Sequence, residues 1–262
     1  MADRITILGS GAACGVPTIS GGWKNCNPQN PKNRRSRAGI YAELGTTEVL
    51  IDTSADLRNQ MLDNNIHSVD GVLYTHAHAD HIMGIDDLRA LNYYTHIGLN
   101  IYAAASHLDE IRLRFGYVFQ DVPSKEKTRR PQLIANVIKY NEPFYIGKTE
   151  IMPLEFAGHT IPTTGYVFNR GQAVIIPDYK KILPETLEYL QKIDVHVLIM
   201  PLTNIETTLY HAGIDIDMNY IRLIKPEKAY FTHMGPDCDY DAVAKLCPSG
   251  VMPAYDGLKI EL

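Results

Sequence analysis

Thr75-His76-Ala77-His78-Ala79-Asp80-His81 is the stretch of sequence on which the predicted fold and site depend. An apolar run lies on each side of it, which is typical of a buried strand that ends in a tight loop and opens a helix. In extended backbone, residues two apart lie on the same side, so His76 and His78 can point together at one position. After the turn, Asp80 and His81 can point at a neighbouring position. The spacing therefore favours two metal ions over one.

A polar, histidine-rich loop without any metal is the alternative interpretation of this stretch. Imidazoles packed together without partners are costly to bury, so a metal site explains the H-x-H-x-D-H spacing better. Each ion would still lack ligands, which must come from elsewhere in the fold.

Length and composition are those of an ordinary globular protein. A chain of 262 residues can form one large domain or two small ones, and its net charge of −5 does not favour a general nucleic-acid binder. No apolar run approaches the roughly 20 residues of a membrane span, and the N-terminus shows no signal-peptide profile. We expect a cytoplasmic protein with reduced thiols, since C-x-x-C pairing is absent among Cys14, Cys26, Cys238 and Cys247.

Hydrophobic patterning predicts two strand-rich halves, with a break within 120–160. Helices are predicted at 57–62, 85–94, 106–115, 184–192 and 217–224. Strands are predicted at 5–8, 39–44, 48–51, 71–74, 99–103, 165–168, 173–176, 195–200 and 229–231, with further strand and turn signals over 136–156.

Several of these apolar strands stop at a residue that can bind or support a metal. The residues concerned are Asp52, His76, Asp178 and His233. Such an arrangement fits an α/β layer in which ligands gather at the carboxyl ends of strands, where loops can hold a site. One case would be unremarkable, but four together predict a shared centre.

We expect two metal ions per chain, held by nitrogen and oxygen ligands. This ligand set suits zinc, manganese or iron without choosing among them. Asp52 is expected to orient a histidine ligand or the loop rather than to bind metal. The first ion is assigned to His76, His78 and His159, the second to Asp80, His81 and His233, and Asp178 is placed as a bridge between them.

A dinuclear centre of this kind points to hydrolysis. Two nearby divalent ions acidify a water molecule and offset charge on the oxygens of a displacement. The leaving group still needs a proton, and His211, which this assignment leaves unused, is the candidate general acid. The alternative for His211 is a surface or helix-capping histidine. Asp80 is counted with His211 as a catalytic residue.

Three other segments carry weaker signals. The turn 9–11 is either an anion-binding turn or simply a glycine-rich turn. The polar loop 20–37 is basic, and its charges are either solvated or steer an anionic substrate. The loop 120–132 is either a plain surface loop or a lid. Residues expected to bind substrate are Ser10, Arg34, Arg35 and Tyr255.

The sequence resembles the metallo-β-lactamase superfamily. The stretch 75–81 matches its H-x-H-x-D-H signature, and Asp52, His159, Asp178 and His233 fall at its other motif positions in order. The resemblance spans nearly the whole chain. It implies an α/β fold (α+β by some schemes), a four-layer αβ/βα sandwich with a dinuclear site, formed as a single domain over 1–262.

A more specific resemblance is to the cyclic-phosphate phosphodiesterase subgroup related to the phosphonate-breakdown pathway. It rests on the opening 9–17, on the segment 232–234, on the ending 253–257 and on His211, which stands where that subgroup carries a catalytic histidine. One departure is clear. Members of the phosphonate pathway carry a cysteine-rich zinc element after the opening loop, and only Cys26 remains here, so no additional structural zinc is expected.

The expected function is a metal-dependent hydrolase of a small cyclic phosphate or nucleotide-like phosphodiester. The alternatives are a thioester or lactone hydrolase, a nuclease of the tRNA 3′-end-processing type, and a metal-containing binding protein without turnover. The expected partner is a small phosphate ester, without membrane or nucleic acid. The oligomeric state stays open, with a homodimer as one alternative.

Overall fold

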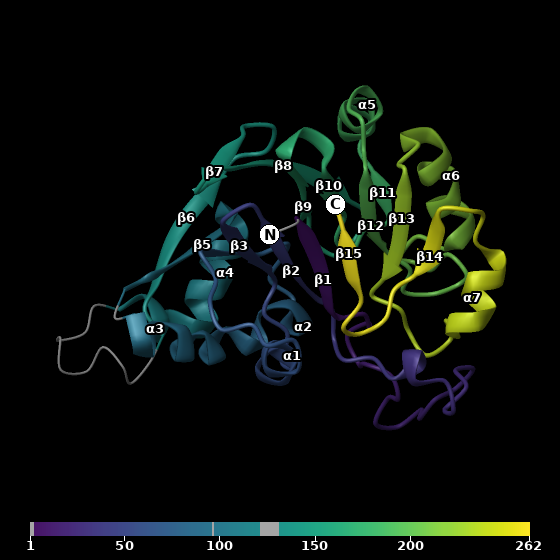
Figure 1. Cartoon of the computed structure of the whole chain (residues 1–262), viewed down its shortest axis with the longest axis horizontal. Coiled ribbons are helices and arrows are strands. Elements are labelled where there is room, and N and C mark those ends of the chain that lie inside the picture. Colours follow the sequence, from purple (N-terminus) through teal and green to yellow (C-terminus); the bar gives the residue numbers. More distant parts are fainter. Residues whose placement is uncertain (1–2, 96, 121–130) are drawn as a thin grey trace.

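Two β-sheets lie face to face in this computed structural model, and helices cover their outer faces (Figure 1). The structure describes residues 3–95, 97–120 and 131–262. Most of the loop for which a lid was considered, residues 121–130, lies outside this range. The four layers, helices, sheet, sheet and helices, confirm the αβ/βα architecture expected from the sequence.

The first sheet combines the N-terminal half of the chain with its last strand. Its neighbours run antiparallel from β15 to β3 and parallel from β3 to β6. The parallel strands each need a crossover, and helices supply it. In spatial order the strands are β15 (Lys259–Glu261), β1 (Arg4–Gly9), β2 (Gly39–Leu44), β3 (Thr47–Ile51), β4 (Gly71–Leu73), β5 (Leu99–Ala104) and β6 (Leu133–Ile138).

The second sheet is built from the C-terminal half. Strands β10, β12, β13 and β14 run parallel, so the loops after them open on the same edge. In spatial order the strands are β11 (Lys181–Ile182), β8 (Thr149–Ala157), β9 (Thr163–Phe168), β10 (Ala173–Ile175), β12 (Val197–Pro201), β13 (Lys228–Thr232) and β14 (Val251–Pro253), while β7 (Phe144–Ile146) pairs with β8.

Helices cover each sheet on the side that faces away from the other sheet. The first sheet carries α1 (Leu57–Asp63), α2 (Ala79–Ile82), α3 (Arg89–Thr95) and α4 (Ala105–Phe115) (Figure 1). The second carries α5 (Pro184–Lys192), α6 (Ile214–Ile224) and α7 (Tyr240–Leu246). Shorter 3-10 helices span Pro31–Asn33, Met83–Leu88, Gly116–Phe119 and Asn169–Gly171.

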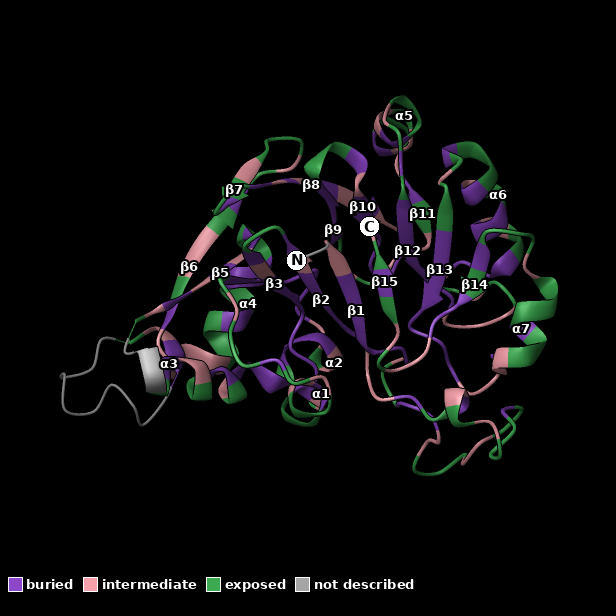
Figure 2. Cartoon of the chain, in the orientation of Figure 1, coloured by how far each residue is buried: buried purple, intermediate pink, exposed green. Residues whose placement is uncertain are grey.

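Three buried apolar clusters hold these layers together. Figure 2 shows that much of the central strands is buried. The middle cluster lies between the two sheets and joins Ile7 of β1 to Ile199 of β12. One outer cluster packs Leu108 of α4 on the first sheet, and the other packs Met218 of α6 on the second. Burying strands on both faces explains their nearly continuous apolar runs. The core therefore fixes both sheets, and with them the loops at their edges.

The predicted elements agree with the structure at most positions, and two differences stand out. The helix predicted at 85–94 is a 3-10 helix, Met83–Leu88, followed by α3. The C-terminal elements α7, β14 and β15 were not predicted. The break between the halves falls between β6 and β7, within the predicted range 120–160. Within the described residues, no helix is both long and apolar enough to cross a membrane.

Candidate metal centre

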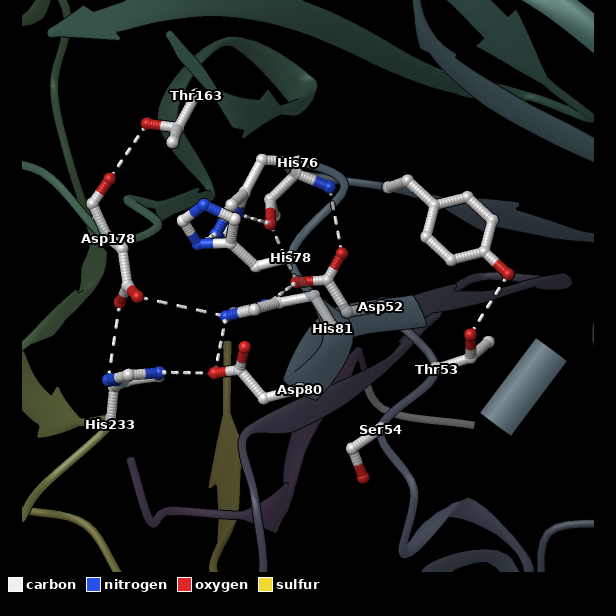
Figure 3. A network of polar contacts seen from close by, with 12 residues as sticks. Asp52, Thr53, Ser54, His76, His78, Asp80, His81, Thr163, Asp178 and His233 are labelled. Carbon is white, nitrogen blue, oxygen red and sulfur yellow. Dashed lines mark hydrogen bonds and ion pairs between the residues drawn. The ribbon is translucent and has the colours of Figure 1, made fainter. Parts of the chain in front are cut away.

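The seven side chains expected to bind metal come together between the ends of the two sheets. Figure 3 labels His76, His78, Asp80, His81, Asp178 and His233 among them. The first sheet supplies four of them from the turn after β4 and from α2. The second sheet supplies the other three from segments that follow β8, β10 and β13. They form two groups in which the potential ligand atoms lie within 4.8 Å of one another: His76, His78 and His159, and Asp80, His81, Asp178 and His233.

In the first group, three ring nitrogens face one another. Nδ1 of His78 lies 3.1 Å from Nε2 of His76 and 3.0 Å from Nε2 of His159. A ring nitrogen that carries no proton presents a lone pair, so these three neighbouring nitrogens can act together as ligands. Such an arrangement is what a bound cation requires.

The opposite nitrogens of these rings are held by hydrogen bonds. The Thr75 hydroxyl donates to Asp52, at 2.7 Å between the oxygens, so Nδ1–H of His76 donates to Thr75 Oγ1 at 3.0 Å. Nε2 of His78 lies 2.9 Å from Thr160 Oγ1. A hydrogen bond on the outer nitrogen sets the tautomer and leaves the inner nitrogen free to bind metal.

In the second group, carboxylates and imidazoles alternate. Nε2 of His81 lies 3.3 Å from Asp80 Oδ2 and 3.8 Å from Asp178 Oδ2. His233 lies 3.4 Å from Asp80 and 3.3 Å from Asp178. His81 Nε2 and Asp178 Oδ1 are buried without a well-formed hydrogen bond in the protein. Buried polar atoms normally have a partner, so these orphaned atoms fit a divalent cation between them.

Asp52 supports the second group from behind without lining the cavity that the cluster opens into (Figure 3). Its carboxylate accepts hydrogen bonds from the backbone N–H of Thr75 at 2.8 Å, from the Thr75 hydroxyl, and from Nδ1–H of His81 at 2.7 Å. Its backbone is left-handed, with φ of 63°, a conformation that aspartate tolerates better than most residues. These contacts fix both the histidine loop and the orientation of the His81 ring.

Burial keeps three histidines neutral. Burial lowers the pKa of His76 well below its usual value, and burial also lowers the pKa of His78 and of His159. Neighbouring imidazoles act in the same direction, because a second positive charge nearby is unfavourable. The neutral ring is the form that coordinates a metal, so the first group is prepared for a cation at neutral pH.

The second group has the opposite charge balance. Burial opposes ionisation of Asp178, but His233, His211 and His81 hold the pKa of its carboxyl well below its usual range. Burial also disfavours the charged form of His81 and by itself would lower its pKa. The carboxylates around the ring, first that of Asp52, outweigh this effect and raise the pKa of His81 well above its usual value. Without metal, His81 is therefore protonated, and a bound cation would replace that positive charge.

His211 lies at the edge of the cluster. Its Nε2 is 3.9 Å from Asp178 Oδ2, and its ring centroid is 5.0 Å from that of His159. The side chain is partly exposed, at 21%. It lies on the long loop between β12 and α6, where Nδ1 of His159 also contacts the carbonyl oxygen of Tyr210 at 3.4 Å. This loop thus carries His211, the candidate proton donor, and also contacts His159, a candidate metal ligand.

The cluster opens into a cavity of about 560 Å³. One wall comes from the segment 12–24 of the N-terminal half, which contributes Thr18, Ser20 and Lys24. Another comes from Thr203 and Asn204, which follow β12. A cavity of this volume suits a small molecule. The cluster residues that line it are His78, Asp80, His159, Asp178, His211 and His233.

The four residues expected to bind substrate lie outside the lining of this cavity. Ser10 is buried, and its N–H and hydroxyl both donate to Asp256. Arg35 is buried and donates to Asn33 Oδ1, while Arg34 lies over the ring of Trp23 and lines a neighbouring cavity of about 680 Å³. Tyr255 lies beneath the Lys32 ammonium group. Contact between these residues and a substrate stays a prediction.

Sequence reasoning missed three side chains that contact ligand histidines, Thr75, Thr160 and Thr203. Thr75 and Thr160 are each adjacent in sequence to a histidine of the cluster, so their position was a usable signal. The basic loop 20–37 was expected either to be solvated or to steer an anionic substrate, but the sequence did not single out Lys24, whose place on the cavity wall depends on how this long loop folds back.

A family model described as a β-lactamase superfamily domain matches residues 47–234. Among curated proteins, an octanoyltransferase of Porphyromonas gingivalis is 30% identical over 259 residues, which are 98% of this chain and 51% of that protein. The chain thus spans about half the length of this relative.

Solved structures give full-length similarity. The crystal structure of a diphosphatase from the PhnP family has a TM-score of 0.89 and 28% identity, and the match covers 100% of this chain and 98% of that one. Zinc-bound PqqB from Methylobacterium extorquens has a TM-score of 0.75 and 17% identity, over 99% of this chain and all of that one. At that identity, the second similarity concerns the fold alone.

Proposed function

The chain belongs to the β-lactamase superfamily, and on that premise we propose that it hydrolyses a small phosphodiester. The same proposal makes it a metal-dependent hydrolase, which the superfamily match and the cluster of potential ligands support. The finer assignment is supported above all by one observation: His211 stands beside Asp178, at the edge of the two ligand groups and within the same cavity. The similarity to a diphosphatase of the PhnP family also favours phosphate chemistry.

We assign a pair of divalent cations, zinc, manganese or iron, to the two ligand groups, with Asp178 between them. Bound there, the cations would acidify a water molecule and offset negative charge on the phosphoryl oxygens. The protein keeps His76, His78 and His159 neutral and aims their free nitrogens at one point. Asp52 holds the ring of His81, so the geometry is fixed before any substrate arrives.

His211 acts as the general acid in this proposal. Its imidazole faces the Asp178 carboxylate and remains partly exposed to the cavity, so it can gain a proton from water and give it to the departing oxygen. A protonated leaving group departs as a neutral alcohol, which removes the cost of expelling an alkoxide. Two contacts hold the loop just before the histidine: the carbonyl of Tyr210 contacts Nδ1 of His159, and the hydroxyl of Thr208 accepts from the backbone N–H of His211.

A substrate panel tests the proposal. Protein loaded with zinc or manganese is assayed with bis(p-nitrophenyl) phosphate, nucleoside cyclic phosphates, a p-nitrophenyl thioester, a lactone and a tRNA precursor. We expect turnover of the phosphodiesters to exceed that of the acyl substrates. Faster turnover of the thioester or lactone would overturn the proposal in favour of acyl chemistry, and cleavage of tRNA in preference to the small diesters would favour a nuclease.

Two variants sharpen the test. His211→Ala should lose phosphodiester hydrolysis while keeping its metal, whereas His67→Ala, at an exposed histidine outside the cavity, should behave as wild type. Full activity of His211→Ala would remove the general acid from the mechanism, even if the substrate class were correct.

A further inference from the structure

We propose that Lys24 is a specificity-determining residue that binds anionic oxygen atoms of the substrate. This inference rests on the proposed function, because it concerns the same cavity. Lys24 lines the cavity together with the cluster residues Asp80, His159 and His233. Among the described residues that line it, Lys24 is the one lysine or arginine.

Charge explains why a lysine here matters. The cavity also contains the carboxylates of Asp80 and Asp178, which would repel an anion if they acted alone. Cations held by the cluster would offset these carboxylates, and Lys24 adds a positive charge that belongs to the protein. An ammonium group binds phosphate oxygens through charge-assisted hydrogen bonds, so it favours phosphate esters over neutral esters.

The loop that carries Lys24 is fixed on the segment after His233. The N–H of Asn25 donates to the carbonyl of Pro236 at 3.2 Å. The N–H of Asn27 donates to Asp239 Oδ2 at 3.0 Å. These contacts tie the wall of the cavity to the strand that delivers His233. The segment after β13 therefore fixes the position of Lys24 as well as that of His233, a residue expected to bind metal.

Two features restrict the conformation of Lys24. Its backbone is left-handed, with φ of 46°, which lysine rarely adopts. Its Nζ lies 3.0 Å from Asp237 Oδ2, while the side chain stays 52% exposed. The Asp237 carboxylate also accepts from the side-chain amide of Asn25 at 3.2 Å. Asp237 thus holds the ammonium group of a residue that lines the cavity, and it leaves this group accessible to solvent.

A purely structural role for the Lys24–Asp237 pair is the competing explanation. Exposed ion pairs contribute little to stability, and the backbone contacts of Asn25 and Asn27 already fix the loop. The structural explanation therefore predicts that both members of the pair act alike. The substrate-binding explanation predicts that Lys24 matters for anions and that Asp237 does not.

Binding of inorganic phosphate to the metal-loaded protein, measured by calorimetry, tests the inference without any turnover. Lys24→Met should weaken phosphate binding about 10-fold or more, because a charge-assisted contact is lost. Lys32→Met is the matched control and should bind phosphate as wild type does, because Lys32 lies on the same loop but over the rings of Tyr240 and Tyr255, outside the cavity. Asp237→Asn should bind phosphate at least as tightly as wild type. Unchanged binding in Lys24→Met, or equal loss in Lys24→Met and Asp237→Asn, would overturn the inference.

A matched pair of substrates shows which anionic group Lys24 contacts. Thymidine 5′-(p-nitrophenyl phosphate) carries one anionic group, and its 3′-phosphorylated form carries two. A rise in KM for both in Lys24→Met places the contact at the reacting phosphate, and a rise only for the second places it at the distant phosphate. Either result supports the inference, and no change for either contradicts it. If wild type hydrolyses neither compound, the proposed function fails, while the phosphate titration still decides the role of Lys24.

Discussion

Replacing Asp52 by asparagine isolates the support that this carboxylate gives to the metal centre. Asparagine has the same shape and tolerates the left-handed backbone at φ of 63°, so the main chain should stay in place. The carboxylate accepts three hydrogen bonds, two from Thr75 and one from Nδ1–H of His81. An amide has a single acceptor oxygen, so one orientation places its NH₂ group against the His81 N–H and the other places it against the Thr75 N–H.

The magnitude follows from the bonds that are lost. A hydrogen bond to a charged group contributes about 1.5–3 kcal/mol. If the NH₂ group of the amide faces His81, Nδ1 of the ring must become the acceptor. The ring proton then moves to Nε2, the nitrogen that should face the metal. Losing one such bond corresponds to about 10–100-fold weaker metal binding, which is also the usual effect of removing a hydrogen-bond partner of a ligand. We expect this loss at the group formed by Asp80, His81, Asp178 and His233.

Titration of the metal-free protein with Zn²⁺, in competition with a chromophoric chelator, measures this effect. Asp52→Asn should show one weakened site out of two and unchanged folding by circular dichroism. Asp56→Asn is the matched control, because Asp56 pairs with Arg37 and lies on the same segment without touching a histidine of the cluster. Wild-type affinity at both sites in Asp52→Asn would refute the supporting role.

The remaining predictions concern one catalytic, one bridging and one buried group. His211→Ala should keep its metal content and lower turnover by about 10²–10⁴-fold, and unchanged turnover would exclude it as the general acid. Asp178→Ala should weaken both metal sites, which elemental analysis after dialysis would detect as less than two ions per chain; full retention would exclude the bridge. Asp217 is buried beneath Tyr179, and burial raises its pKa from 3.8 to about 7, so its contribution to stability is complete below pH 3.8 and is lost as the pH rises to about 7. In the metal-free protein, the free energy of unfolding of wild type relative to Asp217→Asn should therefore fall by up to about 4 kcal/mol over this range, and a pH-independent difference between the two proteins would contradict it.

The sequence carries most of the information needed for the centre. The ligands at 76–81 are close in sequence, and their spacing alone indicates a metal site. Asp178 and His233 lie far away, but each follows an apolar strand, and parallel strands bring such ends to one edge. The superfamily expected from the sequence is confirmed by the match over 47–234, and the similarity to a PhnP-family structure agrees with the expected subgroup.

The parts that were not predicted depend on contacts between distant segments. The last strand, β15, leaves the C-terminal half and pairs with β1, and no local pattern indicates that return. Ser10 follows a strand beside glycines, which suggests an anion-binding turn, but its donors are taken by Asp256 near the end of the chain. Arg35 is a cationic residue of a basic loop, which suggests a contact with an anionic substrate, yet the fold buries it against Asn33.

The stoichiometry of tightly bound metal is the most direct test of the central claim, that seven side chains from two sheets hold a pair of cations. Protein purified without chelators, supplied with Zn²⁺ or Mn²⁺ and passed through a desalting column is analysed by plasma mass spectrometry. Two transition-metal ions per chain are the predicted result. Protein that retains none, or only one that survives the removal of His159 and His233, would contradict it.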